Sequence, residues 1–109
     1  MKIKKNKSTF LEYLGDTPEL RVLDFLIDNH FFDFPLTEMA RGSNVSYNSL
    51  ASFIKSWVER KIVVKTRRIG KSDYYKINLS NSFVKNIIKL DWSLVKKTTV
   101  PDIKEEILT

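Results

Sequence analysis

The stretch LTEMARGSNVSYNSLASFIKSWVERKIVVKTRRIGKSDYYKINL, residues 36–79, decides the fold of this chain. Its first part has the composition of a short helix over residues 38–41, which the side chain of Thr37 can cap. Gly42 can end this helix, because glycine tolerates the positive φ that a turn requires. Residues 42–45 therefore predict a turn after a first, short helix.

A longer helix is predicted over residues 47–61, with Ser46 as its N-terminal cap. At 100° per residue, its main apolar side chains fall within an arc of about 140°. They are Leu50, Phe53, Ile54, Trp57 and Val58. The opposite face carries Asn48, Ser52, Lys55 and Glu59. This helix is therefore expected to bury one side and to keep a polar side for solvent or for a partner.

A β-hairpin is predicted directly after the longer helix. Residues 62–68 and 74–79 alternate apolar with polar side chains and are rich in β-branched residues, which is typical of strands. A short helix, a turn, a longer helix and a hairpin, in that order, predict a helix-turn-helix with a two-stranded wing. The expected fold is α+β, mainly helical, with this hairpin as the wing.

Helices are also predicted on both sides of this motif. Residues 9–14 can form a turn of helix, and Thr17 can cap a broadly apolar helix over residues 18–30. A last helix begins at Ser80 or Asn81. The organisation expected from these elements is a flexible basic arm over residues 1–8, a winged helix-turn-helix domain over 9–97 and an acidic tail over 98–109.

The composition excludes several classes of protein. The chain has 109 residues, no cysteine and 42% apolar residues, which is enough for one domain with a single core. Without cysteine there are no disulfides and no zinc ribbon. No apolar run reaches the ~20 residues of a membrane span, and the amino terminus lacks the apolar stretch of a signal peptide. We therefore expect a cytoplasmic protein that does not contact membranes.

The net charge of +6 is unevenly distributed. Residues 8–54 hold two basic against seven acidic residues, whereas residues 55–76 hold eight basic against two acidic ones. A basic segment after an acidic one indicates a side of the molecule that faces a polyanion such as nucleic acid. The alternative is a lysine-rich surface that is merely solvated.

Residues 36–79 resemble the winged helix-turn-helix of small prokaryotic transcriptional regulators, the MarR-like and ArsR-like groups, and especially their short archaeal members. The family's Thr-Glu-x-Ala step is matched by Thr37-Glu38-Met39-Ala40, and its Val-Ser step before the recognition helix by Val45-Ser46. The resemblance implies a regulator that binds double-stranded DNA in a sequence-specific manner. The chain departs from the family at Lys61-Ile62, where a glycine is common, so the first wing strand can leave the helix differently.

The candidate DNA-binding residues lie on the longer helix and on the wing. An α-helix fits the major groove, where asparagine can pair with adenine, while hydroxyls beside a helix N-terminus suit phosphate. The candidates on the helix are Ser46, Tyr47, Asn48, Ser49, Ser52 and Lys55. Two alternatives stay open here: ordinary solvated polarity for the whole face, and packing on the core for Tyr47.

The wing candidates are Arg67, Arg68 and Lys71, since cations at a wing tip suit the DNA backbone or minor groove. Successive strand residues point to opposite faces, so Arg67 and Arg68 cannot both face a duplex unless the strand bulges. Arg68 and Lys71 are the favoured pair. The alternative is a charged edge strand that prevents aggregation.

The last helix carries apolar residues on two faces. One face, with Phe83, Ile87, Leu90 and Leu94, is expected to cover the core. The other is the predicted homodimer interface and holds Val84, Ile88, Trp92 and Val95. Two alternatives remain: the broad apolar arc of residues 18–30 absorbs both faces, or the N-terminal segment forms the interface.

No constellation of catalytic residues can be assembled, so we expect no enzyme activity, no cofactor and no metal. His30 has no second ligand nearby, and Gly70-Lys71-Ser72 lacks the first glycine of a phosphate-binding loop. The sequence favours a transcriptional regulator that binds double-stranded DNA as a homodimer. The alternatives are a winged helix that docks onto protein and a nonspecific chromatin-associated or replication-associated DNA binder.

Overall fold

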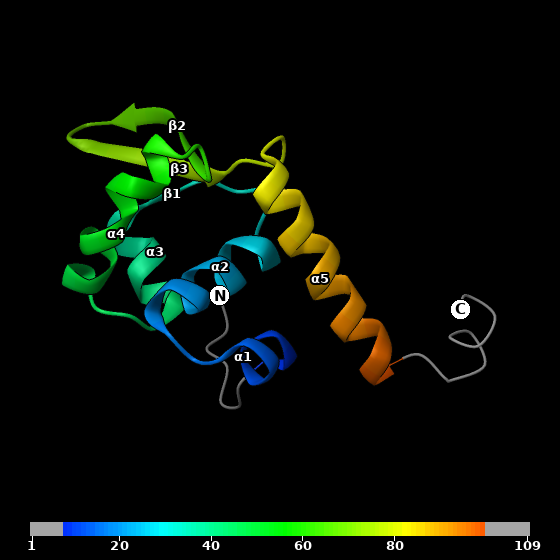
Figure 1. The fold of residues 1–109 in the computed structure, drawn as a ribbon. Helices are drawn as coiled ribbons and strands as arrows, with labels where there is room; N and C mark the ends of the chain where they lie inside the picture. Colours follow the sequence, from blue (N-terminus) through cyan, green and yellow to red (C-terminus); the bar gives the residue numbers. More distant parts are fainter. Residues whose placement is uncertain (1–7, 100–109) are drawn as a thin grey trace.

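A computed structural model describes residues 8–99, with side chains up to residue 94. The remainder of the predicted arm and tail, residues 1–7 and 100–109, lies outside the described part of the chain. The described residues confirm the predicted α+β winged helix-turn-helix (Figure 1). In chain order the elements are α1 (Thr9–Leu14), α2 (Pro18–Asp28), β1 (Phe34–Pro35), α3 (Leu36–Ser43), α4 (Tyr47–Glu59), β2 (Val63–Ile69), β3 (Ser72–Ile77) and α5 (Ser82–Thr99).

Four of these helices begin at a capping side chain, as short polar residues before an apolar run predict. The hydroxyl of Thr17 accepts the backbone N–H of Leu20 at 3.1 Å, which starts α2. The caps of the other three are Ser8 for α1, Ser46 for α4 and Asn81 for α5. Local sequence therefore fixes where most helices start.

Helix α3 differs from its prediction at both ends. It begins at Leu36 after Pro35, without a side-chain cap, so the predicted capping role of Thr37 is wrong. Pro35 ends the extended strand β1, and the helix follows at once. The left-handed turn residue is Asn44, with φ of 59°, and not Gly42. Gly42 is required for packing instead, because a Cβ there would come within 2.6 Å of Cζ in the ring of Phe25.

The sheet is antiparallel, with strand order β1-β3-β2. Strand β1 was missed in the sequence because it has two residues and one of them is a proline; Phe34 pairs with Tyr75. At the base of the wing, Val63 pairs with Ile77 and both are buried. Strand β2 contains a β-bulge between Lys65 and Arg67. By pairing with β3, strand β1 joins the wing to the body of the protein.

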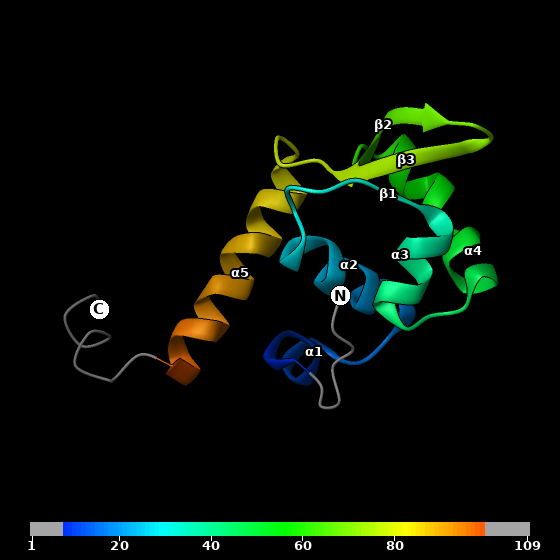
Figure 2. The same cartoon turned by 180° about the vertical axis from the view of Figure 1, so that it is seen from behind.

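The core forms around α2, whose residues 22–27 are all buried. Helices α1, α3 and α4 pack against α2, and the figures show it in the middle of the molecule (Figures 1 and 2). This arrangement explains the broad apolar arc of residues 18–30. Strand β1 adds Phe34, whose ring lies 4.8 Å from that of Phe25.

Helix α5 packs with only part of the predicted core face: Leu94 is buried and Ile87 packs against the core, as expected. Val84 is fully buried and Ile88 packs against the core, whereas Phe83 and Leu90 of the predicted core face are 48% and 37% exposed. Val84 is therefore a residue of the monomer's own core and not an interface residue. The buried stripe runs between the two predicted faces, so it takes residues from both.

The remaining interface candidates differ in exposure. Trp92 is 61% exposed and lies free of the core, and the side chain of Val95 falls outside the described residues.

No helix within residues 8–99 is both long and apolar enough to cross a membrane.

Candidate nucleic-acid interface

The exposed face of α4 divides into hydroxyls that hold the helix together and groups that remain in solvent. The Ser46 hydroxyl accepts the N–H of Ser49 and donates to its Oγ, both at 3.0 Å. The Ser52 hydroxyl donates to the carbonyl of Ser49 at 2.6 Å. Asn48 and Lys55 are exposed on the same helix. These two side chains are therefore the ones on this face most ready to bind a ligand.

Tyr47 stands at the start of α4 and does not pack on the core. It is 49% exposed and lines an open cleft of about 230 Å³ between α4 and the wing. The wing contributes Lys71, Ser72 and Asp73 to this cleft, and Thr37 lines it from α3. The cleft brings the start of α4 and the tip of the hairpin, which are distant in the sequence, to one place.

The bulge in β2 decides which arginine shares a face with the cleft. Lys65 pairs with Tyr75, and Arg68 pairs with Asp73. Tyr75 and Asp73 are two residues apart in β3 and point to the same face, so their partners Lys65 and Arg68 also lie on one face of the hairpin. Arg67 pairs with Tyr74 and lies on the other face. Without the extra residue at the bulge, Arg67 would pair with Asp73 and the two arginines would exchange faces.

Asp73 forms ion pairs with two basic side chains, Lys65 and Arg68, on the face of the wing that borders the cleft. Its carboxylate lies 3.3 Å from Nη1 of Arg68 and 3.5 Å from Nζ of Lys65. Lys71 is exposed at the tip, beside Gly70, whose φ of 61° makes the tight turn. Lys65 was not among the sequence candidates, although alternation from the buried Val63 could have placed it on this face.

Arg67 is bound on the opposite face by a residue that the sequence analysis missed. Its Nε and Nη2 donate to the two carboxylate oxygens of Asp33 at 2.9 and 3.0 Å, and its guanidinium lies 4.6 Å from the centre of the Tyr74 ring. The hydroxyl of Thr66 donates to the same carboxylate at 2.6 Å. Hydrogen bonds from Thr66 and Arg67 hold the pKa of Asp33 below its ordinary value.

The junction between α4 and β2 uses a strained residue. Lys61 has φ of 62°, in the left-handed region where a glycine is common in the family that the sequence resembles. Its carbonyl accepts the side-chain amides of Asn78 at 2.9 Å and Asn81 at 3.1 Å. These bonds stabilise the sharp turn that leads into the wing.

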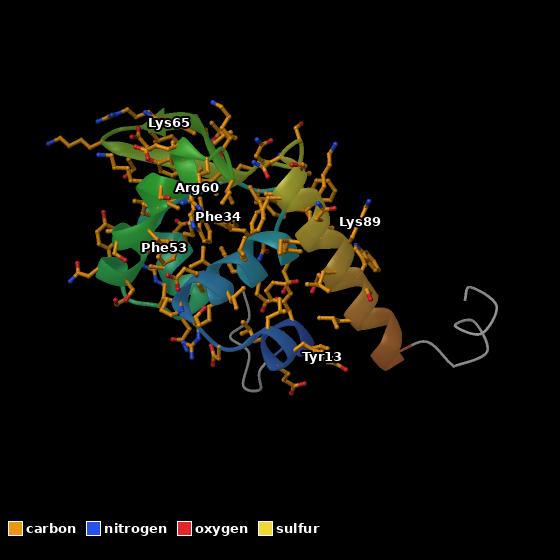
Figure 3. All side chains as sticks on the ribbon, viewed as in Figure 1. Tyr13, Phe34, Phe53, Arg60, Lys65 and Lys89 are labelled. Atoms are coloured by element: carbon orange, nitrogen blue, oxygen red, sulfur yellow. The ribbon has the colours of Figure 1, made fainter. Side chains whose placement is uncertain are left out.

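Exposed lysines occur on both the wing and α5. Lys65 on the wing and Lys89 on α5 lie on opposite sides of the molecule (Figure 3). The described part of the chain holds no group of three or more His, Asp or Glu residues that could bind a metal ion. The single histidine, His30, has its Nδ1 2.8 Å from the carbonyl of Ile27 at the end of α2. The His30 side chain thus lies within hydrogen-bonding distance of a backbone carbonyl at the end of α2.

No protein-family model matches the sequence, and no curated protein matches it either. Among solved structures, the antimony-specific transcriptional repressor AntR is similar with a TM-score of 0.60 at 18% identity, over 82% of this chain and 76% of that one. NadR in complex with 4-hydroxyphenylacetate has a TM-score of 0.60 at 14% identity, over 93% of this chain and 68% of that one. Ligand-free NadR has a TM-score of 0.51 at 12% identity, over 92% and 73%. These likenesses support the winged-helix fold.

Proposed function

We propose that the protein is a transcriptional regulator that binds double-stranded DNA in a sequence-specific manner, as a homodimer and without catalysis. One observation carries this proposal: Tyr47 at the start of α4 and Lys71 at the wing tip line the same cleft, and α4 exposes Asn48 and Lys55 beyond Tyr47. AntR, whose fold is similar, is a transcriptional repressor. The resemblance of residues 36–79 to the MarR-like and ArsR-like groups points the same way.

In this proposal α4 enters the major groove. Asn48 reads an adenine through its amide, Ser52 contacts a neighbouring base edge, and Lys55 binds backbone or guanine. Ser46, Tyr47 and Ser49 lie against phosphate at the helix N-terminus. Glu59 lies one turn beyond Lys55 and would repel phosphate, so the contact ends there.

The wing holds the flank of the same site. Lys65, Arg68 and Lys71 lie along the minor groove or backbone, where their charges displace condensed counterions. The ion pairs with Asp73 hold the charged ends of Lys65 and Arg68 on this face in the absence of DNA. The wing therefore contributes mainly affinity, and α4 contributes sequence preference.

The homodimer is proposed through α5. Trp92 is 61% exposed at one edge of this helix, and a large apolar side chain in solvent favours an interface. A two-fold dimer would present two copies of α4 to half-sites ~10 bp apart, and its binding at a promoter would act by occlusion or recruitment.

Docking onto another protein is the second candidate function. Phe31 and Phe32 are 72% and 61% exposed in the loop between α2 and β1, which is a surface that a partner could cover. In that case the basic wing would have no role in binding. The two candidates differ in their response to DNA.

Competition binding separates the candidates. Duplexes selected from genomic fragments and scrambled duplexes of equal length are titrated at several salt concentrations. A regulator prefers the selected duplex by about 10³-fold or more at physiological salt. Equal binding to both would favour a nonspecific DNA binder, and no binding would favour docking onto protein.

A further inference from the structure

A single carboxylate joins the wing to the body of the protein at the bulge. Asp33 stands directly before β1 and accepts three hydrogen bonds from Thr66 and Arg67 of β2. We call Asp33, Thr66, Arg67 and Tyr74 the bulge clamp. The Asp33 side chain is only 18% exposed, although all its partners come from an edge strand. The clamp is therefore an ordered contact between segments about 34 residues apart.

The clamp acts at the residue that sets the aim of the wing. A bulge bends its strand and increases the local twist, and the extra residue has no partner in the ladder. Here the strand beyond the bulge carries Arg68 and leads to Lys71. Thr66 at the bulge is bonded both to Asp33 and to the carbonyl of Tyr74, at 2.6 and 3.3 Å. These bonds hold the bulged conformation.

Arg67 is poorly placed to contact the DNA itself. Two of its nitrogens bond the Asp33 carboxylate and its guanidinium lies against the ring of Tyr74. It also lies on the face of the hairpin opposite Lys65 and Arg68. A phosphate contact would require the bidentate pair to break.

We propose that Asp33 and Arg67 are positioning residues: by holding the bulge in β2, they orient the wing so that Arg68 and Lys71 face the DNA. This inference deepens the proposed function and rests on it. A wing without the clamp must be ordered when DNA binds, and that ordering lowers affinity. If Arg67 instead contacted DNA directly, Asp33 would compete with the DNA for Arg67 and would lower the affinity.

The Asp33→Asn substitution is expected to change DNA affinity in opposite directions for these two roles. It removes one negative charge from a DNA-binding protein, so through charge alone it would strengthen binding. Loss of the clamp instead weakens binding to the selected duplex, by about three- to tenfold. Glu59→Gln is the matched control, because it removes an exposed acid from α4 without touching the wing and is expected to strengthen binding slightly. Asp33→Glu keeps the carboxylate and is expected to retain most of the affinity.

Arg67→Gln is the second single variant of a double-mutant cycle with Asp33→Asn. It should weaken binding at least as much as Asp33→Asn does, because it breaks the same contact and also removes a positive charge. The double variant should lose little more than Arg67→Gln, because both changes break one contact. The slope of log K against log salt should stay unchanged, whereas a lost phosphate contact would lower it by about 0.9. Stronger binding by Asp33→Asn, or a reduced slope for Arg67→Gln, would overturn the proposal.

Hydrogen exchange in the free protein keeps this test independent of the DNA proposal. In Asp33→Asn, amides of β2 and β3 beyond the bulge should exchange faster while those of α2 stay as protected as in the wild type. Unchanged wing exchange would overturn the clamp even if the protein binds DNA. If the wing loosens but the wild type binds no duplex, the clamp stands as a structural contact, while its role in DNA binding and the proposed function both fail.

Discussion

The side formed by α4 and the wing differs in chemistry from the side formed by α5. The first exposes an amide, hydroxyls and several cations near a cleft, together with Tyr47 and Ile69, which are 49% and 50% exposed. The second exposes Phe83, Leu90 and Trp92 on a long helix. Polar, cationic surfaces suit a polyanion, and exposed apolar surfaces suit a protein partner. The two sides of this small chain thus expose different kinds of side chain, and the proposed function assigns DNA to the first and dimer assembly to the second.

The largest expected effect comes from the α5 side. Trp92→Glu should give a folded monomer, because a buried charge in an apolar seam is costly and Trp92 is not part of the core. Affinity for a palindromic duplex should fall by about 100-fold, whereas affinity for one half-site should hardly change.

Sedimentation equilibrium and circular dichroism on the same sample decide this prediction. Lys89→Glu is the control, since it places the same charge at an exposed polar position of α5. A Trp92→Glu protein that stays dimeric would place the interface elsewhere.

The next effect concerns sequence preference on the α4 side. Asn48→Ala should cost about 1–3 kcal/mol on the preferred duplex and little on random DNA, because it removes a base contact. Asn86→Ala, an exposed asparagine of α5, should leave both affinities unchanged. Equal weakening of Asn48→Ala on both duplexes, measured by fluorescence anisotropy, contradicts a base-reading role.

The wing should affect salt dependence more than sequence preference. Replacing Arg68 and Lys71 with alanine should weaken binding to all duplexes alike and reduce the salt slope by up to about 2. The same net charge is removed by replacing Lys85 and Lys89, which are exposed on α5, and this control should leave the slope nearly unchanged. Equal slopes for the two double variants would show that only net charge matters.

The junction between α4 and the wing offers a smaller, purely structural effect. Lys61→Gly should stabilise the fold by up to about 1 kcal/mol, because glycine adopts a φ of 62° without the strain that a side chain meets. Lys61→Ala removes the same charge but keeps a Cβ, so it should not stabilise. Urea denaturation of both variants measures the difference, and equal stabilities would contradict strain at Lys61.

The smallest effect is a shift in titration at the bulge clamp. The pKa of Asp33 is lowered in the folded protein, first by Thr66 and then by Arg67, so its contribution to stability is present above its ordinary pKa and is lost as pH falls through the lowered value. Carbon-detected NMR should find the Asp33 midpoint below 3.8, the ordinary value. The Thr66→Val variant should raise this midpoint, and an unchanged midpoint contradicts the hydrogen bond.

Sequence predicted the parts of this molecule that local interactions decide. The caps at Thr17 and Ser46, the polar face of α4 and the hairpin all follow from residues within a few positions of one another. The start of α3 was predicted wrongly because pairing of β1 with β3, a distant contact, sets it. The packing face of α5 was predicted only in part: Ile87 and Leu94 are covered as expected, but the neighbours that bury Val84 cannot be read from the periodicity of α5 alone.

The same limit applies to the candidate site. Asn48, Ser52 and Lys55 could be chosen from helical spacing, and alternation showed that Arg67 and Arg68 face opposite sides unless the strand bulges. Alternation alone could not choose between the two arginines, because the bulge exchanges their faces. The partnership of Arg67 with Asp33 could not be predicted, because it joins a loop to a strand far along the chain and depends on a bulge. Such contacts are decided by the sheet and not by neighbouring residues.

NMR spectra of the labelled protein with and without its selected duplex test the central claim most directly, because they identify the side that binds DNA. We predict that backbone amides of residues 46–55 and of the wing tip, residues 68–73, shift most. Amides of residues 86–94 on α5 should shift little when the oligomeric state is held constant. Shifts concentrated on α5 or around Phe31 and Phe32, with none on α4, would contradict the account.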